Sequence, residues 1–316
     1  KQWILPPHPN PLPRGKRVQL ENQLRGRGDN RKKIHTIISD RVKYIYQTPL
    51  IPRNDPVMRK SKTLARIRNN QTVRMCCLGH YIPMFIKHAA HNGFDCIWLD
   101  LEHRNFSDRD VQVLLVQSHL HDIDIMVRPT TTEKTKLYRY LEDGAAGLMI
   151  PHVNTAEKAR MLVDAVKYPP IGDRGLDGAG LDADFYCGNT DEFVKGANEE
   201  TFLVVQVETP LAVNNVEEIA SVAGLDGIFV GPGDLGLRLK QDPGKMTLDA
   251  AIERVAAACA KNGKAWGLPV GTPEILQQRQ KQGGQLLNYG GDFGAIMDML
   301  RESIKAFDGH AQQSAG

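Results

Sequence analysis

The chain has 316 residues, 41% of them hydrophobic, and a formal net charge of +3 at pH 7. This length suits one large domain or two ordinary ones, and the hydrophobic content is enough for a sizeable core. No apolar stretch approaches the roughly 18 residues that a membrane-spanning helix needs, and no charged-then-apolar signal peptide opens the sequence. We therefore expect no membrane span and no secretory targeting.

The five cysteines indicate a reducing compartment. They form an odd set without a CxxC pair, which disfavours a disulfide framework and a structural zinc site. Some of them lie in or beside predicted buried strands. We therefore expect reduced thiols and a cytoplasmic location.

Positive charge is concentrated at the start of the chain. Residues 1–70 hold 17 Lys and Arg against 4 Asp and Glu, whereas the residues after position 70 hold 23 basic and 33 acidic side chains. Residues 1–55 combine a proline-rich run at 6–13 with a basic run at 26–33 and show no sustained periodicity. We predict a disordered extension over 1–55, a globular domain over 56–307 and a flexible tail over 308–316. A nucleic-acid-binding arm is the disfavoured alternative, because the basic run lacks interleaved stacking aromatics.

From about residue 57 onward, short apolar runs alternate with longer amphipathic stretches. The runs predict eight strands, at Val73–Leu78, Cys96–Leu101, Ile123–Val127, Gly147–Pro151, Phe202–Val207, Gly227–Val230, Lys264–Leu268 and Gln285–Tyr289. The stretches between them predict helices near 83–92, 107–119, 133–142, 155–167, 210–221, 247–262, 272–282 and 291–305. This alternation, over about 250 residues, favours an α/β fold of the (β/α)8 TIM-barrel type. A doubly wound sheet is the rival, but no GxGxxG follows the first strand.

Two carboxylates follow neighbouring strands of this barrel. Glu208 comes directly after the run 202–207, and Asp234 follows the run 227–230 across a Gly-Pro-Gly turn. Because the carboxyl ends of barrel strands form the active-site mouth, the two side chains suit a hard divalent cation there. We predict magnesium, with manganese or cobalt as alternatives, and open positions for a bidentate 2-oxo acid such as pyruvate. The competing interpretation is that Glu208 only caps the following helix, which begins with Pro210.

Other strand ends supply groups that a 2-oxo acid would need. Arg128 would bring a permanent positive charge to a carboxylate or a developing enolate oxygen, although a structural ion pair is the alternative. His103 follows the second strand in an acidic context, where a base is needed. Gln206 shares a strand face with Glu208, and the backbone at Gly233 could approach a carboxylate closely because glycine lacks a side chain.

Residues 168–180 form a glycine-rich segment between the fourth and fifth strands. The segment is too long for a simple connector and predicts a loop over the mouth, with Arg174 as a candidate substrate contact; a flexible surface loop is the alternative. No lysine lies at a strand end near the other candidates, and Lys264 opens its strand at the opposite end. A Schiff-base mechanism is therefore disfavoured.

Several segments, in order along the chain, carry a resemblance to a known family. They are Asp100–His103, Val127–Pro129, Gly144–Gly147 with Pro151–Val153, Pro169–Gly175, Gln206–Thr209 and Gly231–Leu235. Over about residues 62 to 305 the chain resembles the HpcH/HpaI aldolase family of metal-dependent class II pyruvate aldolases, whose members include macrophomate synthase and 2-keto-3-deoxy-sugar-acid aldolases.

The resemblance implies a modified TIM barrel whose eighth helix is exchanged between partners, usually in homohexamers built as trimers of dimers. It implies that Glu208 and Asp234 bind the metal. It also implies that Arg128 steadies the pyruvate enolate and that His103 belongs to the acid–base apparatus.

The same resemblance assigns the pyruvate contacts to Gln206 and to the amides of Gly233 and Asp234. Glu142 stands where the family has the aspartate that assists the histidine, with an arm one methylene longer. Near Cys77, many relatives carry a bulky aromatic, and this departure falls in the pocket for the aldehyde.

Together these features predict a metal-dependent aldolase. The reaction would be the reversible cleavage of a 4-hydroxy-2-oxo acid to pyruvate and an aldehyde, through a metal-bound pyruvate enolate. The rivals are an acyl-CoA lyase of the citrate lyase β-subunit class, which would need a basic nucleotide groove, and an oxaloacetate decarboxylase. A non-catalytic sensor that binds a 2-oxo acid is the alternative outside the enzymes.

Overall fold

The computed structural model describes residues 58–186, 190–241, 244 and 246–313. The chain divides into two units, Lys1–Pro56 and Val57–Gly316, and the described residues belong to the second. The extension predicted over 1–55 therefore lies outside the described residues, and so do the last three residues of the predicted tail.

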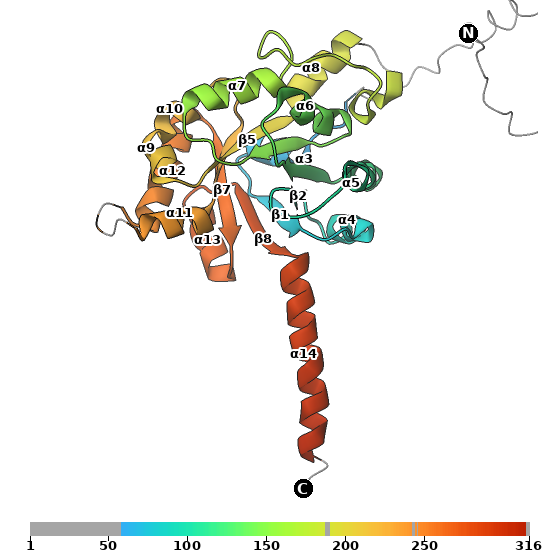
Figure 1. Ribbon diagram of the computed structural model, residues 1–316, viewed down its shortest axis with the longest axis vertical. Helices are drawn as coiled ribbons and strands as arrows, with labels where there is room; N and C mark the ends of the chain where they lie inside the picture. The colour runs from blue at the N-terminus through green and yellow to red at the C-terminus, as the bar shows by residue number, and fades with distance from the viewer. Residues whose placement is uncertain (1–57, 187–189, 242–243, 245, 314–316) are drawn as a thin grey trace, which may run out of the picture. The chain divides into compact units, whose positions relative to one another are not determined.

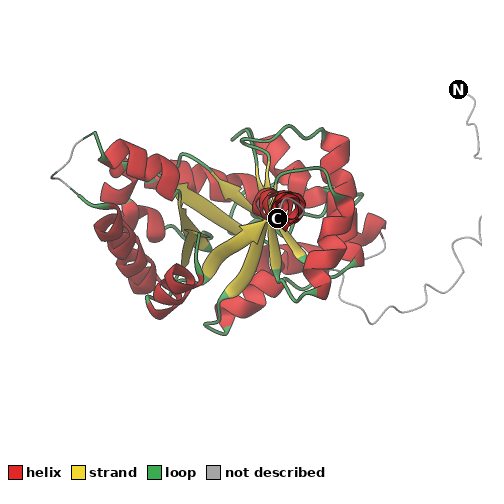
Figure 2. Ribbon diagram, turned by 90° about the horizontal axis from the view of Figure 1, so that it is seen from below, coloured by secondary structure: helices red, strands yellow, loops and turns green. Residues whose placement is uncertain are grey.

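Eight parallel strands close into a barrel in which β8 pairs back with β1 (Figures 1 and 2). In chain order they are β1 (Val73–Leu78), β2 (Cys96–Asp100), β3 (Asp124–Arg128), β4 (Gly147–Ile150), β5 (Phe202–Val207), β6 (Gly227–Val230), β7 (Ala265–Val270) and β8 (Leu286–Gly291). The predicted (β/α)8 barrel is confirmed. Because all strands run the same way, their carboxyl ends form one rim, which we call the mouth.

Helices surround the strands and connect each strand to the next. They are α3 (Lys62–Arg68), α4 (Pro83–His91), α5 (Asp108–Leu120), α6 (Lys134–Glu142), α7 (Ala156–Val166), the 3-10 helix η1 (Leu181–Tyr186), α8 (Thr190–Glu200), α9 (Pro210–Asn214), α10 (Val216–Ala220), α11 (Pro232–Leu239), α12 (Leu248–Asn262), α13 (Pro273–Lys281) and α14 (Asp292–Gln313). No helix in these described ranges is long and apolar enough to cross a membrane.

Side chains alternate along each strand between the barrel interior and the layer beneath the helices. The interior is filled by large apolar side chains, among them Phe202, Trp98 and Phe229, and the last two rings stack edge to face with centroids 5.5 Å apart. Gly147 makes room for this filling, since a Cβ there would lie 2.3 Å from the Phe202 ring. The barrel is thus a packed core rather than a pore, and a ligand can enter only at the mouth.

Helix α3 covers the N-terminal end of the barrel. Its Leu64 is buried among the interior side chains. Asp124, at the start of β3, accepts hydrogen bonds from the Ser61 hydroxyl (2.7 Å) and the Thr63 backbone N–H (2.8 Å). Arg59 pairs with the same carboxylate at 2.6 Å. Because this carboxylate is fully buried and satisfied, it fixes the entering chain to the barrel.

The helix α14 projects from the mouth end instead of packing along the side of the barrel (Figures 1 and 2). It continues through Gln313, past the start of the tail predicted from 308. The helix predicted over 210–221 is instead broken at Asn215 into α9 and α10, and the sequence patterns did not predict α3, α8 or α11. The described cysteines, Cys76, Cys77, Cys96 and Cys259, are free thiols, as expected.

Candidate active site

Arg128 is the centre of a buried ion-pair network at the mouth. It ends β3 and is 6% exposed. Its Nε and Nη2 contact the two oxygens of Asp100 at 3.0 and 2.9 Å, and its Nη1 lies 3.0 Å from Glu102 Oε2. The guanidinium also stands 4.7 Å from the centroid of the Trp98 ring. Two carboxylates thus face one cation in a largely dry environment, where charges interact strongly.

The Glu102 carboxylate is incompletely satisfied by this contact. No described residue forms an aligned hydrogen bond with its buried Oε2, although Arg128 is close enough for an ion pair. Buried oxygens of this kind normally have a hydrogen-bond partner. Glu102 Oε2 is therefore held in the network by the charge of Arg128 rather than by an aligned hydrogen bond.

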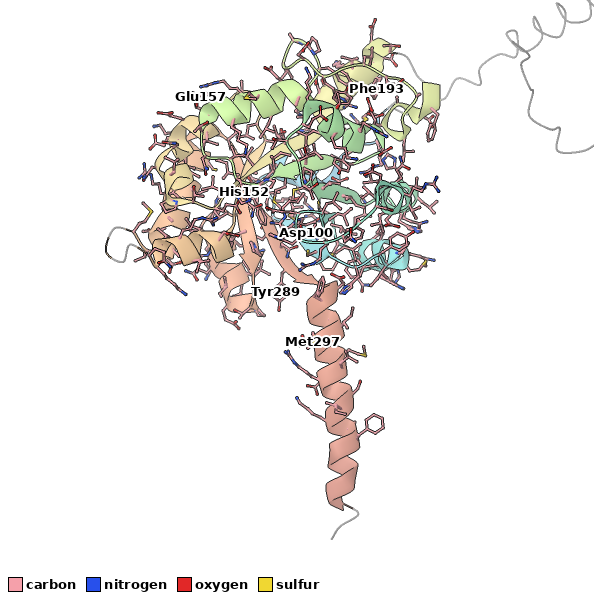
Figure 3. The ribbon with its side chains drawn as sticks, viewed as in Figure 1. Asp100, His152, Glu157, Phe193, Tyr289 and Met297 are labelled. Atoms are coloured by element: carbon pink, nitrogen blue, oxygen red, sulfur yellow. The ribbon has the colours of Figure 1, made fainter. Side chains whose placement is uncertain are left out.

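Glu208 follows β5 and is 2% exposed. Its Oε1 accepts hydrogen bonds from the backbone N–H of His152 at 2.7 Å and lies 2.6 Å from the Nδ1 of the same residue. The other imidazole nitrogen of His152 is 3.0 Å from Glu102 Oε1, so the ring lies between two carboxylates (His152 is labelled in Figure 3). Burial, together with the nearby charges of Glu102 and Asp234, raises the pKa of Glu208, although His152 acts in the opposite direction.

Asp234 lies in the first turn of α11, beside Glu208. Its Oδ1 pairs with Arg238 at 2.6 Å, and the side chain is 45% exposed. Arg238 also donates to the backbone carbonyl of Glu208 at 3.3 Å. Helix α11 begins with Pro232, two residues after the end of β6. The positive end of its helix dipole therefore faces the mouth.

Two further candidates line the same place. Gln206 is buried and its Oε1 accepts a hydrogen bond from Arg128 at 3.4 Å. A Cβ at Gly231 would lie 2.7 Å from Gln206 Nε2 and 2.9 Å from Glu208 Oε2. A Cβ at Gly233 would meet nothing within 4 Å, so the backbone there is accessible from the mouth.

The donor set fits a hard divalent cation. The carboxylates of Glu102 and Asp234 both act on that of Glu208, and their repulsion contributes to the raised pKa of Glu208. Over the described ranges, no three His, Cys, Asp or Glu side chains converge closely enough to hold a metal by themselves. Magnesium is commonly bound by one or two carboxylates together with water or substrate oxygens, which agrees with this arrangement.

His103 lies at the mouth with its side chain 56% exposed. Its Nε2 is 3.7 Å from Glu102 Oε2, and its backbone N–H donates to Asp100 Oδ1 at 3.3 Å. The carboxylate beside this imidazole is therefore Glu102. The predicted partner Glu142 does not contact it within the chain.

Glu142 and Arg174 lie together, away from the mouth. Glu142 ends α6, which starts at the mouth and runs toward the N-terminal ends of the strands. Arg174 is buried against Asp182 at 2.8 Å, with its guanidinium 4.5 Å from the Tyr168 ring. Burial raises the pKa of Glu142, and the charge of Arg174 lowers it, so the two side chains interact.

The loop over 168–180 explains this placement. It begins at the C-terminal end of α7, which in a βα barrel lies opposite the mouth, and it returns along the outer side of α6 and α7. The Asp173 backbone N–H donates to the Asp164 carbonyl at 3.0 Å, and a Cβ at Gly175 would touch Tyr138 at 3.6 Å. The prediction that this loop covers the mouth of the barrel in the same chain was therefore wrong.

His152 belongs to this network of contacts, although the sequence patterns gave it no role. It lies two residues beyond the end of β4, and a lone histidine gives little signal in a sequence. Its φ of +56° turns both its backbone N–H and its ring toward Glu208. Its position close to the carboxyl end of a barrel strand was the signal that could have identified it.

A cavity of about 470 Å³ opens beside Glu102 and His152. Its remaining lining comes from Pro129, Thr130–Thr132, Pro151 and Lys158. The threonine hydroxyls and the lysine amine supply polar groups to a ligand that reaches the carboxylates.

Comparison with known proteins agrees with this geometry. The family model for HpcH/HpaI aldolase/citrate lyase matches residues 75–298. This range contains all eight strands apart from the first two residues of β1. The chain belongs to the HpcH/HpaI aldolase/citrate lyase family. A relative from Pseudomonas putida, 2-dehydro-3,6-dideoxy-6-sulfogluconate aldolase, is 32% identical over 228 residues, or 72% of this chain and 89% of its own length. The 2-keto-3-deoxy-L-rhamnonate aldolase of Escherichia coli K12 is 32% identical over 225 residues, or 69% and 82%.

Solved structures of the family have the same fold. An HpcH/HpaI aldolase from Desulfitobacterium hafniense superposes with a TM-score of 0.72 at 27% identity and covers 77% of this chain and 95% of its own. Macrophomate synthase superposes with a TM-score of 0.69 at 23% identity, over 81% and 90% of the two chains, and shares the fold. The aldolase relatives and the carboxylate-lined mouth together identify the chain as a member of a lyase family.

Proposed function

We propose that this protein is a divalent-metal-dependent aldolase that reversibly cleaves a 4-hydroxy-2-oxo acid to pyruvate and an aldehyde. The observation that carries the proposal is Glu208, a buried carboxylate with a raised pKa, placed at the mouth between Glu102 and Asp234. The names of the aldolase relatives describe a 2-keto-3-deoxy acid and a 2-dehydro-3,6-dideoxy acid, which are both 2-oxo acids.

Glu208 and Asp234 would hold the metal, most simply magnesium, with manganese or cobalt as alternatives. When bound, the metal supplies a Lewis acid for the carboxylate and ketone of the 2-oxo acid. The amides at Gly233 and Asp234 lie at a helix N-terminus, where a substrate carboxylate is favoured. Gln206 can donate its amide N–H to the ketone oxygen.

The protein groups perform the proton transfers and stabilise the developing charge. In cleavage, the 4-hydroxyl gives its proton to His103, directly or through a water, as the C3–C4 bond breaks and the aldehyde forms. The electron pair of that bond moves toward C2 and its oxygen, where the fixed charge of Arg128 stabilises it. Protonation of C3 then yields pyruvate.

Glu142 cannot assist His103 in the same chain, because α6 carries it to the other end of the barrel. A dyad of these two residues would require two copies of the chain. Within one copy, Glu102 is the carboxylate that can orient His103.

We also propose that the chain forms homo-oligomers through α14, with the hexamer of the family resemblance as the expected assembly. One side of α14 carries Phe293, Met297, Leu300, Ile304 and Phe307, each at least 41% exposed (Met297 is labelled in Figure 3). This spacing of three and four residues is typical of a helix face that packs against another surface. A groove of about 200 Å³ lined by residues of β1, β8 and α13 lies on the flank that an eighth helix would cover.

The test is pyruvate release from a panel of 4-hydroxy-2-oxo acids and from oxaloacetate, with Mg²⁺ or Mn²⁺ added. We expect pyruvate from the hydroxy acids; pyruvate from oxaloacetate alone would refute the aldolase and favour a decarboxylase. Binding of metal and pyruvate without turnover would favour the sensor.

The variant Glu208→Gln should lose metal binding, measured by calorimetry, and metal-dependent turnover, while it keeps its thermal unfolding temperature within a few degrees. The control Glu218→Gln makes the same change at an exposed position of α10 and should behave as the parent protein. Metal-dependent turnover retained by Glu208→Gln would disprove the ligand assignment.

A further inference from the structure

A second polar cluster lies at the mouth, on the side of β1 and β8, and the reaction proposed above does not use it. The cluster consists of His80 and Arg104, with the ring of Phe293 against both. The imidazole lies 4.0 Å from that ring, centroid to centroid, and the Arg104 guanidinium lies 4.4 Å from the ring centroid.

A buried carboxylate orients the histidine. Asp292, 2% exposed at its side chain, accepts hydrogen bonds from the backbone N–H groups of Gly79 (2.9 Å) and His80 (2.8 Å). Its Oδ2 also lies 2.6 Å from His80 Nδ1. One imidazole nitrogen is therefore committed to Asp292, and Nε2 faces outward from a ring that is 45% exposed. Over the described ranges, Nε2 has no hydrogen-bond partner.

Arg104 is a cation without a carboxylate partner among the described residues. Its Nη1 donates to the backbone carbonyl of His103 at 2.8 Å, which leaves the other guanidinium N–H groups available. The absence of a side chain at Gly79 makes room for this arrangement, since a Cβ there would lie 3.0 Å from Arg104 Nε and 2.3 Å from Phe293 Cε2. A guanidinium over an aromatic ring keeps its remaining N–H groups free to bind an oxyanion.

The cluster opens on the same mouth as the carboxylate site. Arg104 follows Glu102 by two residues, and Glu102 contacts Arg128 at 3.0 Å. In the closed strand order, β1 lies four strands away from β5, which carries Glu208. A substrate bound by its 2-oxo acid end at Glu208 would reach this cluster with its other end if it extended across the mouth, toward β1.

We propose that His80 and Arg104 bind an anionic group at the far end of the aldehyde half of the substrate. The preferred aldehyde then carries a carboxylate, a sulfonate or a phosphate. This inference rests on the proposed aldolase function, and it names the class of aldehyde that the site takes. Arg104 supplies the charge and a bidentate fork, and His80 Nε2 supplies a hydrogen bond in a direction fixed by Asp292.

The first experiment compares matched aldehydes in the addition to pyruvate. Succinic semialdehyde and butanal have the same four-carbon chain, and only the first ends in a carboxylate. Glyceraldehyde 3-phosphate and glyceraldehyde form the second pair. We expect kcat/KM to favour an anionic member by about tenfold or more, and the two pairs distinguish a carboxylate from a phosphate.

The variants Arg104→Gln and His80→Gln should each reduce that preference by about tenfold and change kcat/KM for the neutral aldehyde by less than about threefold. Arg109→Gln removes the same charge from an exposed position five residues further on and should leave the preference unchanged. A parent protein without a preference, or an Arg104→Gln variant that loses both aldehydes equally, would overturn the inference.

The second experiment needs no turnover. Succinate and inorganic phosphate are titrated into the full chain with calorimetric detection, for the parent protein and for the Arg104→Gln and Arg109→Gln variants. We expect binding of at least one anion that weakens about tenfold in Arg104→Gln alone. Such binding in a protein that cleaves no hydroxy-oxo acid would retain the anion site and reject the aldolase. Binding that is absent, or equal in all three proteins, would reject the anion site.

Discussion

Glu102 connects the two halves of the carboxylate site. One of its oxygens lies 3.0 Å from His152 and the other 3.0 Å from Arg128, so both side chains contact the same carboxylate. His152 in turn contacts Glu208 at 2.6 Å. A change at any member of this chain of contacts would alter the position of the proposed metal ligand, as groups around metal ligands commonly do.

At the scale of single residues, the glycine beside Glu208 gives a sharp prediction. The variant Gly231→Ala places a methyl group 2.9 Å from Glu208 Oε2 and 2.7 Å from Gln206 Nε2, so both side chains must move. We expect metal affinity, measured by calorimetry, to fall by about 10–100-fold, the range found when groups supporting a metal ligand are changed.

The matched control is Gly233→Ala, because its methyl group would meet nothing within 4 Å and Gly233 has no positive φ. This variant should bind the metal as the parent does. Equal losses in both variants would show that backbone flexibility, and not the space beside Glu208, determines the affinity.

The sequence predicted the position of a site residue correctly where that residue lies at the end of a strand. Glu208, Arg128 and Gln206 directly follow or end strands, and parallel strands bring such positions to one rim whatever the loops do. Glu142 was assigned by resemblance to the family, and Arg174 was assigned from the composition of its loop. Neither the resemblance nor the composition indicates in which direction a helix or loop runs from the mouth. Both lie at the other end of the barrel for that reason.

At the scale of elements, the strands were predictable and several helices were not. The strands β1, β5 and β6 have the predicted bounds, since buried parallel strands are short continuous apolar runs. Helix α11 begins within the Gly-Pro-Gly turn, where composition indicates a loop, although proline is favourable in a first helical turn. Helix α3 is stabilised by Asp124, a residue 61 positions beyond Thr63 in sequence, which no local pattern can reveal.

Helix α14 gives the prediction that belongs to this scale. Its apolar face should be covered in the assembled protein, because exposed apolar faces of this kind mark interaction surfaces. The double variant Leu300→Glu with Ile304→Glu should dissociate the oligomer to a monomer in light scattering after gel filtration.

The control is Ala295→Glu with Ala306→Glu, which adds the same two charges on the opposite, exposed face of α14. It should keep the mass of the parent, and far-ultraviolet circular dichroism should show equal helix content in all three proteins. A parent protein that is already monomeric would refute the proposed assembly.

At the scale of the whole molecule, acidic residues near the N-terminal ends of the strands set the response to acid. Burial tends to raise the pKa of Asp95, but hydrogen bonds from Arg74 and the charge of Arg66 outweigh it, so the pKa lies below its ordinary value. The same holds for Glu200, where the Ser61 N–H and the charge of Arg68 outweigh burial. A carboxyl whose pKa is lowered on folding stabilises the fold above its unfolded pKa, and this stability is lost as the pH falls through the folded pKa.

We therefore expect the free energy of unfolding to be steady near neutral pH and to fall below about pH 4, the ordinary range of these groups. The variant Asp95→Asn should cost about 1.5–3 kcal/mol at pH 7. Urea titrations should show this difference shrinking as the pH is lowered to 3. A difference that stays constant over that range would contradict the role of the ionised carboxylate.

The boundary of the folded unit is the remaining property of the whole molecule that can be tested. Among the described residues, the entering chain is held by the buried Met58 and by Arg59 and Ser61, which both bind the buried Asp124. A chain starting at residue 56 keeps these contacts, so its turnover and unfolding temperature should match those of the full chain. A chain starting at residue 62 leaves Asp124 without Arg59 and α3 without its cap, at a cost of about 3–5 kcal/mol. For a domain of this size the loss corresponds to a fall of about 10 °C in the unfolding temperature, which calorimetry would resolve. If the chain from residue 56 unfolds at the temperature of the full protein but has lost its turnover, residues 1–55 have a function that their composition does not reveal.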